Sequence, residues 1–170
     1  MDHVVRLAVP ADIVEVIELL ADAAARLRAK GIEQWPERFP ETYIRHLVEQ
    51  GVVYVAVSDE EVNGSFCLQW SDVAFWGTRS DAGFIHHLAV RQSYAGLGRE
   101  LIAWADQRAA EEGRGFLCLD CWAGNDRLRR YYKELGFHNV GEIGGSEQHP
   151  YLASERLWKA VLYERPVGTY

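Results

Sequence analysis

Residues 86–105, HHLAVRQSYAGLGRELIAWA, decide the fold of this chain. The segment begins within a strand predicted over residues 83–90, and apolar residues then recur at helical spacing over residues 99–112. Gly96 and Gly98 lie between these two elements. Glycines let the backbone approach a ligand closely, and the N–H groups and dipole at a helix start favour an anion. The segment therefore predicts a strand, a glycine turn and a helix, with phosphate binding or a plain connection as the alternatives for the turn.

The remaining elements follow from hydrophobic periodicity and from turn residues. Strands 83–90 and 116–122 are joined through a helix, so we expect them to be parallel in an α/β fold with a mixed sheet. The expected order is β-α-α-β-β-β-α-β-α-β-β, in which residues 59–64 form a hairpin turn with Asn63-Gly64 as its signal and a loop covers residues 71–81. The other expected strands are 4–9, 52–57, 65–70, 137–143 and 156–163, and the other expected helices are 10–31, 41–50 and 125–135.

Composition limits the class of protein. The 170 residues fit a single domain over residues 1–170, with 48% hydrophobic and 25% charged residues. A net charge of −7 argues against nucleic-acid binding, although it would attract a cationic amine. The chain has no apolar run long enough to span a bilayer and its N-terminus does not resemble a signal peptide, so we expect no membrane partner and a cytoplasmic location.

The three cysteines are Cys67, Cys118 and Cys121. An odd number of cysteines in predicted strands does not indicate a disulfide framework. Cys118 and Cys121 have CxxC spacing, but a zinc site would need a second such pair, and a redox motif would stand at a helix start. We therefore expect no metal.

Several motifs resemble the GNAT superfamily of N-acetyltransferases. Leu88-Ala89-Val90 and Leu101-Ile102, on either side of the turn, are similar to its motif A, and Asn125 with RYYKELGF at 130–137 resembles its second conserved block. The start RLAVPAD at 6–12 is also similar, whereas GIEQWP at 31–36 and LQWSD at 68–72 resemble uncharacterised actinobacterial-type members. The resemblance implies the GNAT acyl-CoA N-acyltransferase fold, acetyl-CoA as co-substrate and direct acetyl transfer to a primary amine.

The resemblance also implies a coenzyme site. The turn departs from the family pattern because only four residues separate Gly96 from Leu101-Ile102, which leaves open a catalytically degenerate acyl-CoA-binding sensor or partner module. Asn125 either contacts the coenzyme or caps its helix. The implied coenzyme contacts are the strand residues Leu88, Ala89 and Val90, the turn residues Ala95, Gly96, Leu97, Gly98 and Arg99, and Asn125.

His86 is the candidate general base. Alternate residues of a strand share a face, so we expect Phe84, His86 and Leu88 on one side and Ile85 and His87 on the other. Family members with a catalytic residue on this strand use the same side as His86, and an imidazole takes up a proton near neutral pH. The alternative is a hydrogen-bonded core histidine or one that only lines the pocket.

Tyr132 matches the family tyrosine that protonates the leaving thiolate, with a helix-packing aromatic as the alternative. The acceptor is an unidentified small-molecule or peptide amine, and the resemblance leaves a homodimer open. Aromatic and acidic side chains are expected to line the pocket for the amine acceptor, with core packing or ion pairing as the alternative. The pocket candidates are Trp35, Trp70, Trp76, Asp120 and Trp122.

Overall fold

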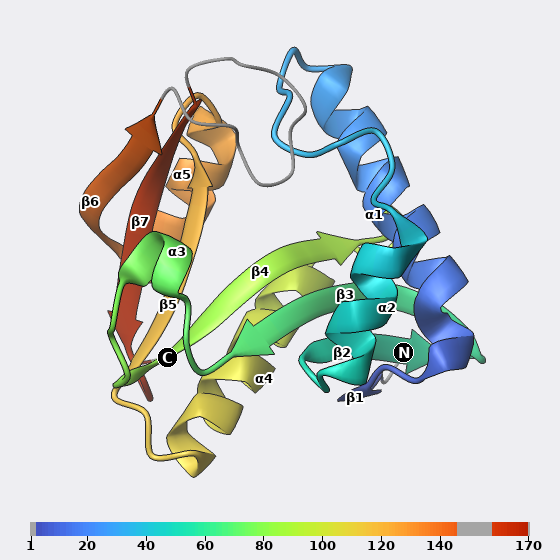
Figure 1. Ribbon diagram of the computed structural model, residues 1–170, viewed down its shortest axis with the longest axis horizontal. Coiled ribbons are helices and arrows are strands. Elements are labelled where there is room, and N and C mark those ends of the chain that lie inside the picture. Colours follow the sequence, from blue (N-terminus) through green and yellow to red (C-terminus); the bar gives the residue numbers. More distant parts are fainter. Residues whose placement is uncertain (1–2, 146–157, 170) are drawn as a thin grey trace. The chain divides into compact units, whose positions relative to one another are not determined.

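The computed structural model describes residues 3–145 and 158–169 (Figure 1). Its element order follows the predicted one, with a short 3₁₀ helix and a short helix α3 added. The first two residues of the predicted strand 156–163 lie outside the described residues. The elements are β1 (Val4–Leu7), η1 (Pro10–Asp12), α1 (Ile13–Arg28), α2 (Glu41–Glu49), β2 (Val53–Ser58), β3 (Glu61–Gln69), α3 (Val73–Trp76), β4 (Ala82–Val90), α4 (Leu97–Glu111), β5 (Phe116–Trp122), α5 (Asp126–Glu134), β6 (His138–Gly145) and β7 (Trp158–Pro166).

A mixed sheet of seven strands, in the order β1-β2-β3-β4-β5-β7-β6, confirms the predicted α/β class. Strands β4 and β5 pair in parallel from Ala82 opposite Phe116 to Ile85 opposite Leu119. This is the direction expected for two strands joined through a helix. The pairs β1–β2, β2–β3, β5–β7 and β6–β7 are antiparallel.

The chain forms two compact units, which divide β4 and α4 between them. The first unit contains Met1–Leu68 and His86–Trp104. Its helices α1 and α2 pack together, and each buries the apolar stripe that its periodicity predicts. In the same unit, Arg6 donates to both carboxylate oxygens of Asp12, at 2.7 and 3.0 Å, and this pair ties β1 to the start of α1.

The second unit contains Gln69–Ile85 and Ala105–Tyr170. Ala82, Phe84 and Cys118 are fully buried together, and Trp76 and Phe116 pack against them. Elsewhere in this unit Arg165 is also buried, and it donates to Asp106 at 2.8 Å and to the carbonyl of Leu135 at 2.7 Å. Burial of both charges is tolerated because each has a partner of opposite sign or a hydrogen bond.

The turn lies within the predicted segment 59–64, but its assignment to Asn63-Gly64 is wrong. Asp59 and Glu60 make the turn between β2 and β3, with φ values of +52° and +66°. Gly64 lies inside β3, where a Cβ atom would come within 2.9 Å of Leu101 Cδ1 and 3.2 Å of Leu97 Cδ2. The glycine therefore serves the close packing of α4 on the sheet and does not serve a turn.

The predicted loop at residues 71–81 also contains a helix, α3. Asp72 caps it, because its carboxylate accepts a hydrogen bond from the N–H of Phe75 at 3.2 Å. A helix of four residues gives too short a pattern for periodicity to detect.

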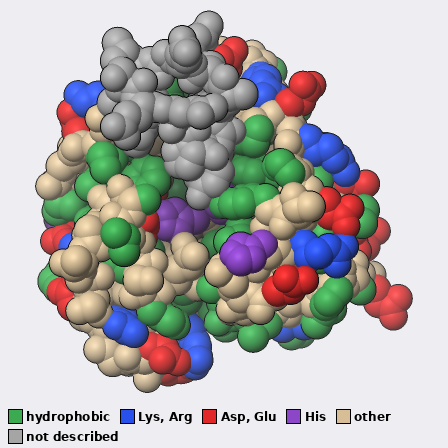
Figure 2. Space-filling view, in the orientation of Figure 1, with side chains coloured by type: hydrophobic (Ala, Val, Ile, Leu, Met, Phe, Trp, Pro, Cys, Tyr) green, Lys and Arg blue, Asp and Glu red, His purple; other side chains and the backbone are tan. Residues whose placement is uncertain are grey.

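Two surface properties bear on partners. None of the helices in the described ranges is long and apolar enough to cross a membrane. On the face drawn in Figure 2, Lys and Arg side chains are interspersed with Asp and Glu side chains. This mixed pattern is ordinary for a chain with a net charge of −7.

Candidate active site

In the first unit, β4 ends at Val90 and α4 begins at Leu97, with the glycine turn between them. Gly96 has a φ of +97°, and no atom lies within 4 Å of the position where its Cβ would be. The Leu97 side chain is buried below the turn, while Ala95, Gly96 and Arg99 are exposed. One side of the turn is thus anchored in the core and the other is open, as backbone binding of an anion requires.

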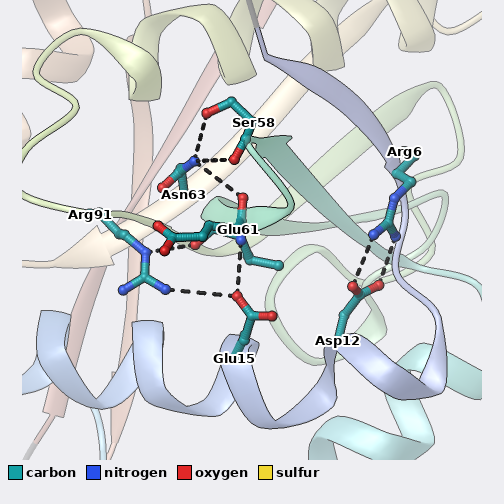
Figure 3. Close-up of polar contacts among 8 residues, drawn as sticks. Arg6, Asp12, Glu15, Ser58, Glu61, Asn63 and Arg91 are labelled. Carbon is teal, nitrogen blue, oxygen red and sulfur yellow. Dashed lines mark hydrogen bonds and ion pairs between the residues drawn. The ribbon is translucent and has the colours of Figure 1, made fainter.

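Two arginines fix the end of β4 just before this turn. Arg91 donates from Nε to the carbonyl of Val62 at 2.8 Å, and Glu15 accepts from the N–H of Val62 at 3.0 Å (Figure 3). The guanidinium of Arg91 also lies 3.8 Å from the Glu15 carboxylate. Arg26 donates to the carbonyl of Val90 at 2.9 Å. The start of the turn is therefore tied to both α1 and β3.

The short spacing after Gly96 does not disturb the helix. Leu101 and Ile102 are almost completely buried. The Trp104 ring lies 4.9 Å from that of Tyr54, measured between ring centroids. The apolar face of α4 is thus in phase with the core, as the resemblance to the family requires.

The expected alternation of side chains along β4 is wrong at His87. This residue has a φ of +53°, in the left-handed region that β-strands do not use. The ring centroids of His86 and His87 lie only 6.3 Å apart, whereas neighbouring side chains of a regular strand point to opposite faces. The two imidazoles are therefore brought together, with His86 partly exposed.

His87 lies among three aromatic rings and a thiol. Burial, and secondarily the neighbouring His86, lowers the pKa of His87 to about 3, so the ring is neutral at physiological pH. The sequence analysis missed this cluster, because aromatic residues every fourth position at 35, 39 and 43 are a weak signal. The surrounding groups are Trp35 at 6.3 Å, Phe39 at 5.1 Å and Tyr43 at 5.9 Å between ring centroids, and Cys67, whose Sγ lies 3.6 Å from Nδ1.

Tyr132 lies in the second unit, on α5, with 6% of its surface exposed. Its ring packs near those of Phe137 and Tyr163, with centroid distances of 5.9 and 6.1 Å. Burial raises the pKa of Tyr132 well above its usual value, and the nearby Cys121 and Asp120 raise it further. Its hydroxyl group therefore keeps its proton at neutral pH.

Asn125 stands at the start of α5 and caps it. Its side-chain oxygen accepts a hydrogen bond from the N–H of Leu128 at 3.1 Å, and the residue is buried. The capping role considered in the sequence analysis is thus present. A coenzyme contact by Asn125 stays a prediction.

Four of the pocket candidates belong to the second unit. Arg114 lies over the Trp70 ring at 5.3 Å, and Arg79 over the Trp76 ring at 5.6 Å. Both tryptophans thus have packing partners within their own unit. Asp120 and Trp122 lie on β5, opposite Leu162 and Ala160 of β7. Only Trp35, of the five candidates, belongs to the unit that carries His86.

All three cysteines are free and buried. Burial raises the pKa of each thiol to about 12. Since the thiolate is the reactive form, these cysteines are poor nucleophiles at neutral pH. No group of three or more His, Cys, Asp or Glu side chains suited to a metal ion occurs in residues 3–145 and 158–169.

Comparison with known proteins identifies the family. The sequence model described as the acetyltransferase (GNAT) family matches residues 15–137. The chain belongs to the GNAT family. It is 30% identical over 146 residues to the "Uncharacterized N-acetyltransferase YesJ" of Bacillus subtilis (strain 168), which covers 79% of this chain and 81% of that protein. The chain is therefore an N-acetyltransferase with acetyl-CoA as its co-substrate, as predicted.

Solved structures show the same fold. A GNAT acetyltransferase from Listeria monocytogenes 4b F2365 has a TM-score of 0.74 at 22% identity, over 96% of this chain and 94% of that one. The acetyltransferase yncA from Salmonella typhimurium, solved with its cofactor acetyl-CoA, has a TM-score of 0.68 at 17% identity, over 100% and 96% of the two chains. At these identities the likeness concerns the fold alone.

Proposed function

We propose that this N-acetyltransferase transfers the acetyl group directly to a primary amine, with His86 as the general base and Tyr132 as the proton donor. The observation that carries the proposal is the place of His86. Its imidazole is partly exposed on the strand that leads into the glycine turn, in the same compact unit. An imidazole can take up a proton near neutral pH, which suits this task.

The residues of the turn fit the coenzyme. The open side of Gly96 leaves room for a pyrophosphate, and the exposed Arg99 adds a positive charge. The backbone of Leu88–Val90 would pair with the pantetheine arm, as in the family. Bound acetyl-CoA supplies an acetyl group activated as a thioester. The N–H near Leu88 would donate a hydrogen bond to the thioester oxygen.

The proton balance of the reaction assigns a role to each candidate residue. The amine nitrogen forms a bond to the acetyl carbon as the carbon–sulfur bond breaks. His86 takes the proton that the amine loses, directly or through water. Tyr132 gives a proton to the sulfur, and its hydroxyl group is protonated at neutral pH. His87 is a poor alternative base, because its pKa of about 3 leaves it with little affinity for a proton.

Direct transfer is supported by the state of the cysteines. A route through an acetyl-cysteine would need a thiolate, and burial opposes thiolate formation at Cys67, Cys118 and Cys121 alike. The acceptor is proposed to be a small-molecule or peptide amine. The net charge of −7 favours approach of a cationic amine, and the partly exposed Trp35 offers a ring face to it.

Thiol release from acetyl-CoA, measured with a panel of primary amines, tests the proposal. We expect at least one amine to accelerate release over simple hydrolysis. His86→Ala should then lower kcat/KM by about 100-fold or more, because general base catalysis contributes about 10²–10⁴. Tyr132→Phe should lower kcat. Calorimetry should show unchanged coenzyme affinity in the His86 variant.

Two results would contradict this assignment. If coenzyme binds but neither variant changes any measured rate, His86 and Tyr132 are not the catalytic pair. If mass spectrometry finds an acetyl group on a cysteine after incubation with acetyl-CoA alone, transfer is not direct. The exposed His46 on α2 supplies the matched control, since His46→Asn should leave the rates unchanged.

A further inference from the structure

The backbone conformation of His87 costs free energy that the same conformation would not cost a glycine. A left-handed φ is unfavourable for a residue with a Cβ atom and is free of that cost for glycine. The chain nevertheless has an imidazole at this position, in the middle of β4. Strain of this kind persists only where the surroundings enforce it, and it often accompanies function.

The surroundings of the ring supply that enforcement. The Phe39 ring meets His87 edge to face, at 85° and 5.1 Å, and Tyr43 does so at 76° and 5.9 Å. Edge-to-face pairs of rings are stabilising beyond the area that they bury. The Cys67 thiol lies against Nδ1 from β3. Contacts from α2, the segment before it and β3 thus hold one side chain and outweigh the cost of its backbone.

The conformation of His87 has a consequence for the residue before it. The left-handed backbone interrupts the alternation of the strand, so the rings of His86 and His87 lie 6.3 Å apart and inclined at 50°. A regular strand would point His86 away from the cluster. The direction of the His86 imidazole therefore depends on the backbone that the His87 ring secures.

We propose that His87 is a positioning residue, whose enclosed ring holds the left-handed backbone that directs the His86 imidazole. The inference rests on the proposed role of His86 and adds to it. His87 transfers no proton and touches no substrate. It acts through His86, in the way that supporting residues orient a catalytic group.

A double-mutant cycle on kcat/KM tests this coupling. We expect His87→Ala to lower kcat/KM by about 10- to 100-fold, as misplacement of a catalytic group does. In a His86→Ala background, the same change should lower the rate by no more than about twofold. A merely structural role for His87 would give the same loss in both backgrounds, and that result would overturn the inference.

A second comparison separates the ring from the backbone. His87→Gly removes the ring but allows the left-handed φ, whereas His87→Ala removes the ring and disfavours that φ. We expect His87→Gly to retain more activity than His87→Ala, with both variants folded by circular dichroism. Equal activity in the two variants, or greater activity in His87→Ala, would contradict a role through the backbone.

A spectroscopic readout keeps the test independent of activity. In protein labelled with ¹³C-histidine, the His86 signal is assigned by its loss in His86→Ala. We expect this signal to move in His87→Ala and to return toward its wild-type position in His87→Gly. An unmoved signal in His87→Ala overturns the positioning role. If the signal moves as expected but His86→Ala retains full activity, the proposed base fails while the coupling between the two histidines stands.

Discussion

The two compact units bury ionisable side chains in opposite ways. The first unit holds His87, which keeps part of its surface exposed, as a neutral ring among aromatic side chains, with its pKa lowered to about 3. The second unit buries Arg165 and Asp106 as an ion pair, with side-chain exposures of 1% and 5%. A buried charge is costly unless it is removed or paired, and these two sites illustrate the two solutions.

The neighbours of each group explain the difference. The contacts of His87 are with aromatic rings, a thiol and a second imidazole, and none of these groups carries a negative charge. Arg165 meets the Asp106 carboxylate and a backbone carbonyl, and its guanidinium lies 4.7 Å from the centroid of the Phe137 ring. The N–H of Gly168 also donates to Asp106 at 2.9 Å. Removing a partner of Arg165 should therefore lower the free energy of unfolding more than removing a partner of His87.

The largest effect is expected at Asp106. Asp106→Ala leaves the Arg165 charge buried without its carboxylate, which costs about 3–5 kcal/mol of unfolding free energy. Urea unfolding followed by circular dichroism measures this loss. Glu112→Ala is the matched control, since Glu112, an exposed residue just after the end of α4, pairs with Arg108 of that helix at 2.6 Å. That variant should lose no more than about 0.5 kcal/mol. If both variants lose the same free energy of unfolding, burial does not determine how much the Asp106–Arg165 pair contributes to stability.

An acid titration should reveal the neutral His87. The pKa of His87 in the folded chain, about 3, lies below the ordinary value of 6.5. Between these two values the imidazole is protonated in the unfolded chain and stays neutral in the folded chain. Stability from this group is complete above pH 6.5 and is lost as the pH falls toward 3. The expected loss is about 2 kcal/mol between pH 6.5 and pH 5. Urea midpoints measured across this range give the slope.

Variants separate His87 from other titrating groups. His87→Asn tolerates the left-handed backbone and should remove this part of the slope. His46→Asn, at an exposed site, should retain it. The pKa of Asp12 is lowered, chiefly by its hydrogen bonds with Arg6, so its contribution is lost only at more acidic pH. A slope that His87→Asn leaves unchanged would mean that His87 is protonated in the folded chain.

The sequence could predict features that depend on neighbours in the chain. Residues 83–90, the glycine turn and the start of α4 were predictable, because glycine and apolar spacing report local geometry. The same reasoning failed at Asn63-Gly64, where the glycine serves contacts with Leu97 and Leu101 from another element. A glycine in the sequence can indicate either a turn or a close packing contact. Only the tertiary structure distinguishes the two.

Neither the Arg165–Asp106 ion pair nor the backbone conformation of His87 could be predicted from the sequence. Arg165 and Asp106 are 59 residues apart, and nothing local shows that they meet. The φ of His87 follows from packing by Phe39, Tyr43 and Cys67, which come from distant segments. His86 was predictable as a candidate because its residue type and strand resemble the family, whereas its direction was not.

The smallest effect on stability is expected at Cys67. A variant at this position tests which neighbour keeps His87 neutral. Cys67→Ser retains the size of the side chain and replaces the weakly polar Sγ beside Nδ1 with a hydroxyl group, which can donate or accept a hydrogen bond. Because the rings of Phe39 and Tyr43 stay in place, we expect the unfolding free energy to change by no more than about 1 kcal/mol. The acid slope should persist, since a single neutral hydroxyl does not replace the hydration that a cation loses on burial. Loss of the slope in Cys67→Ser would instead assign the neutrality of His87 to its contact with the thiol.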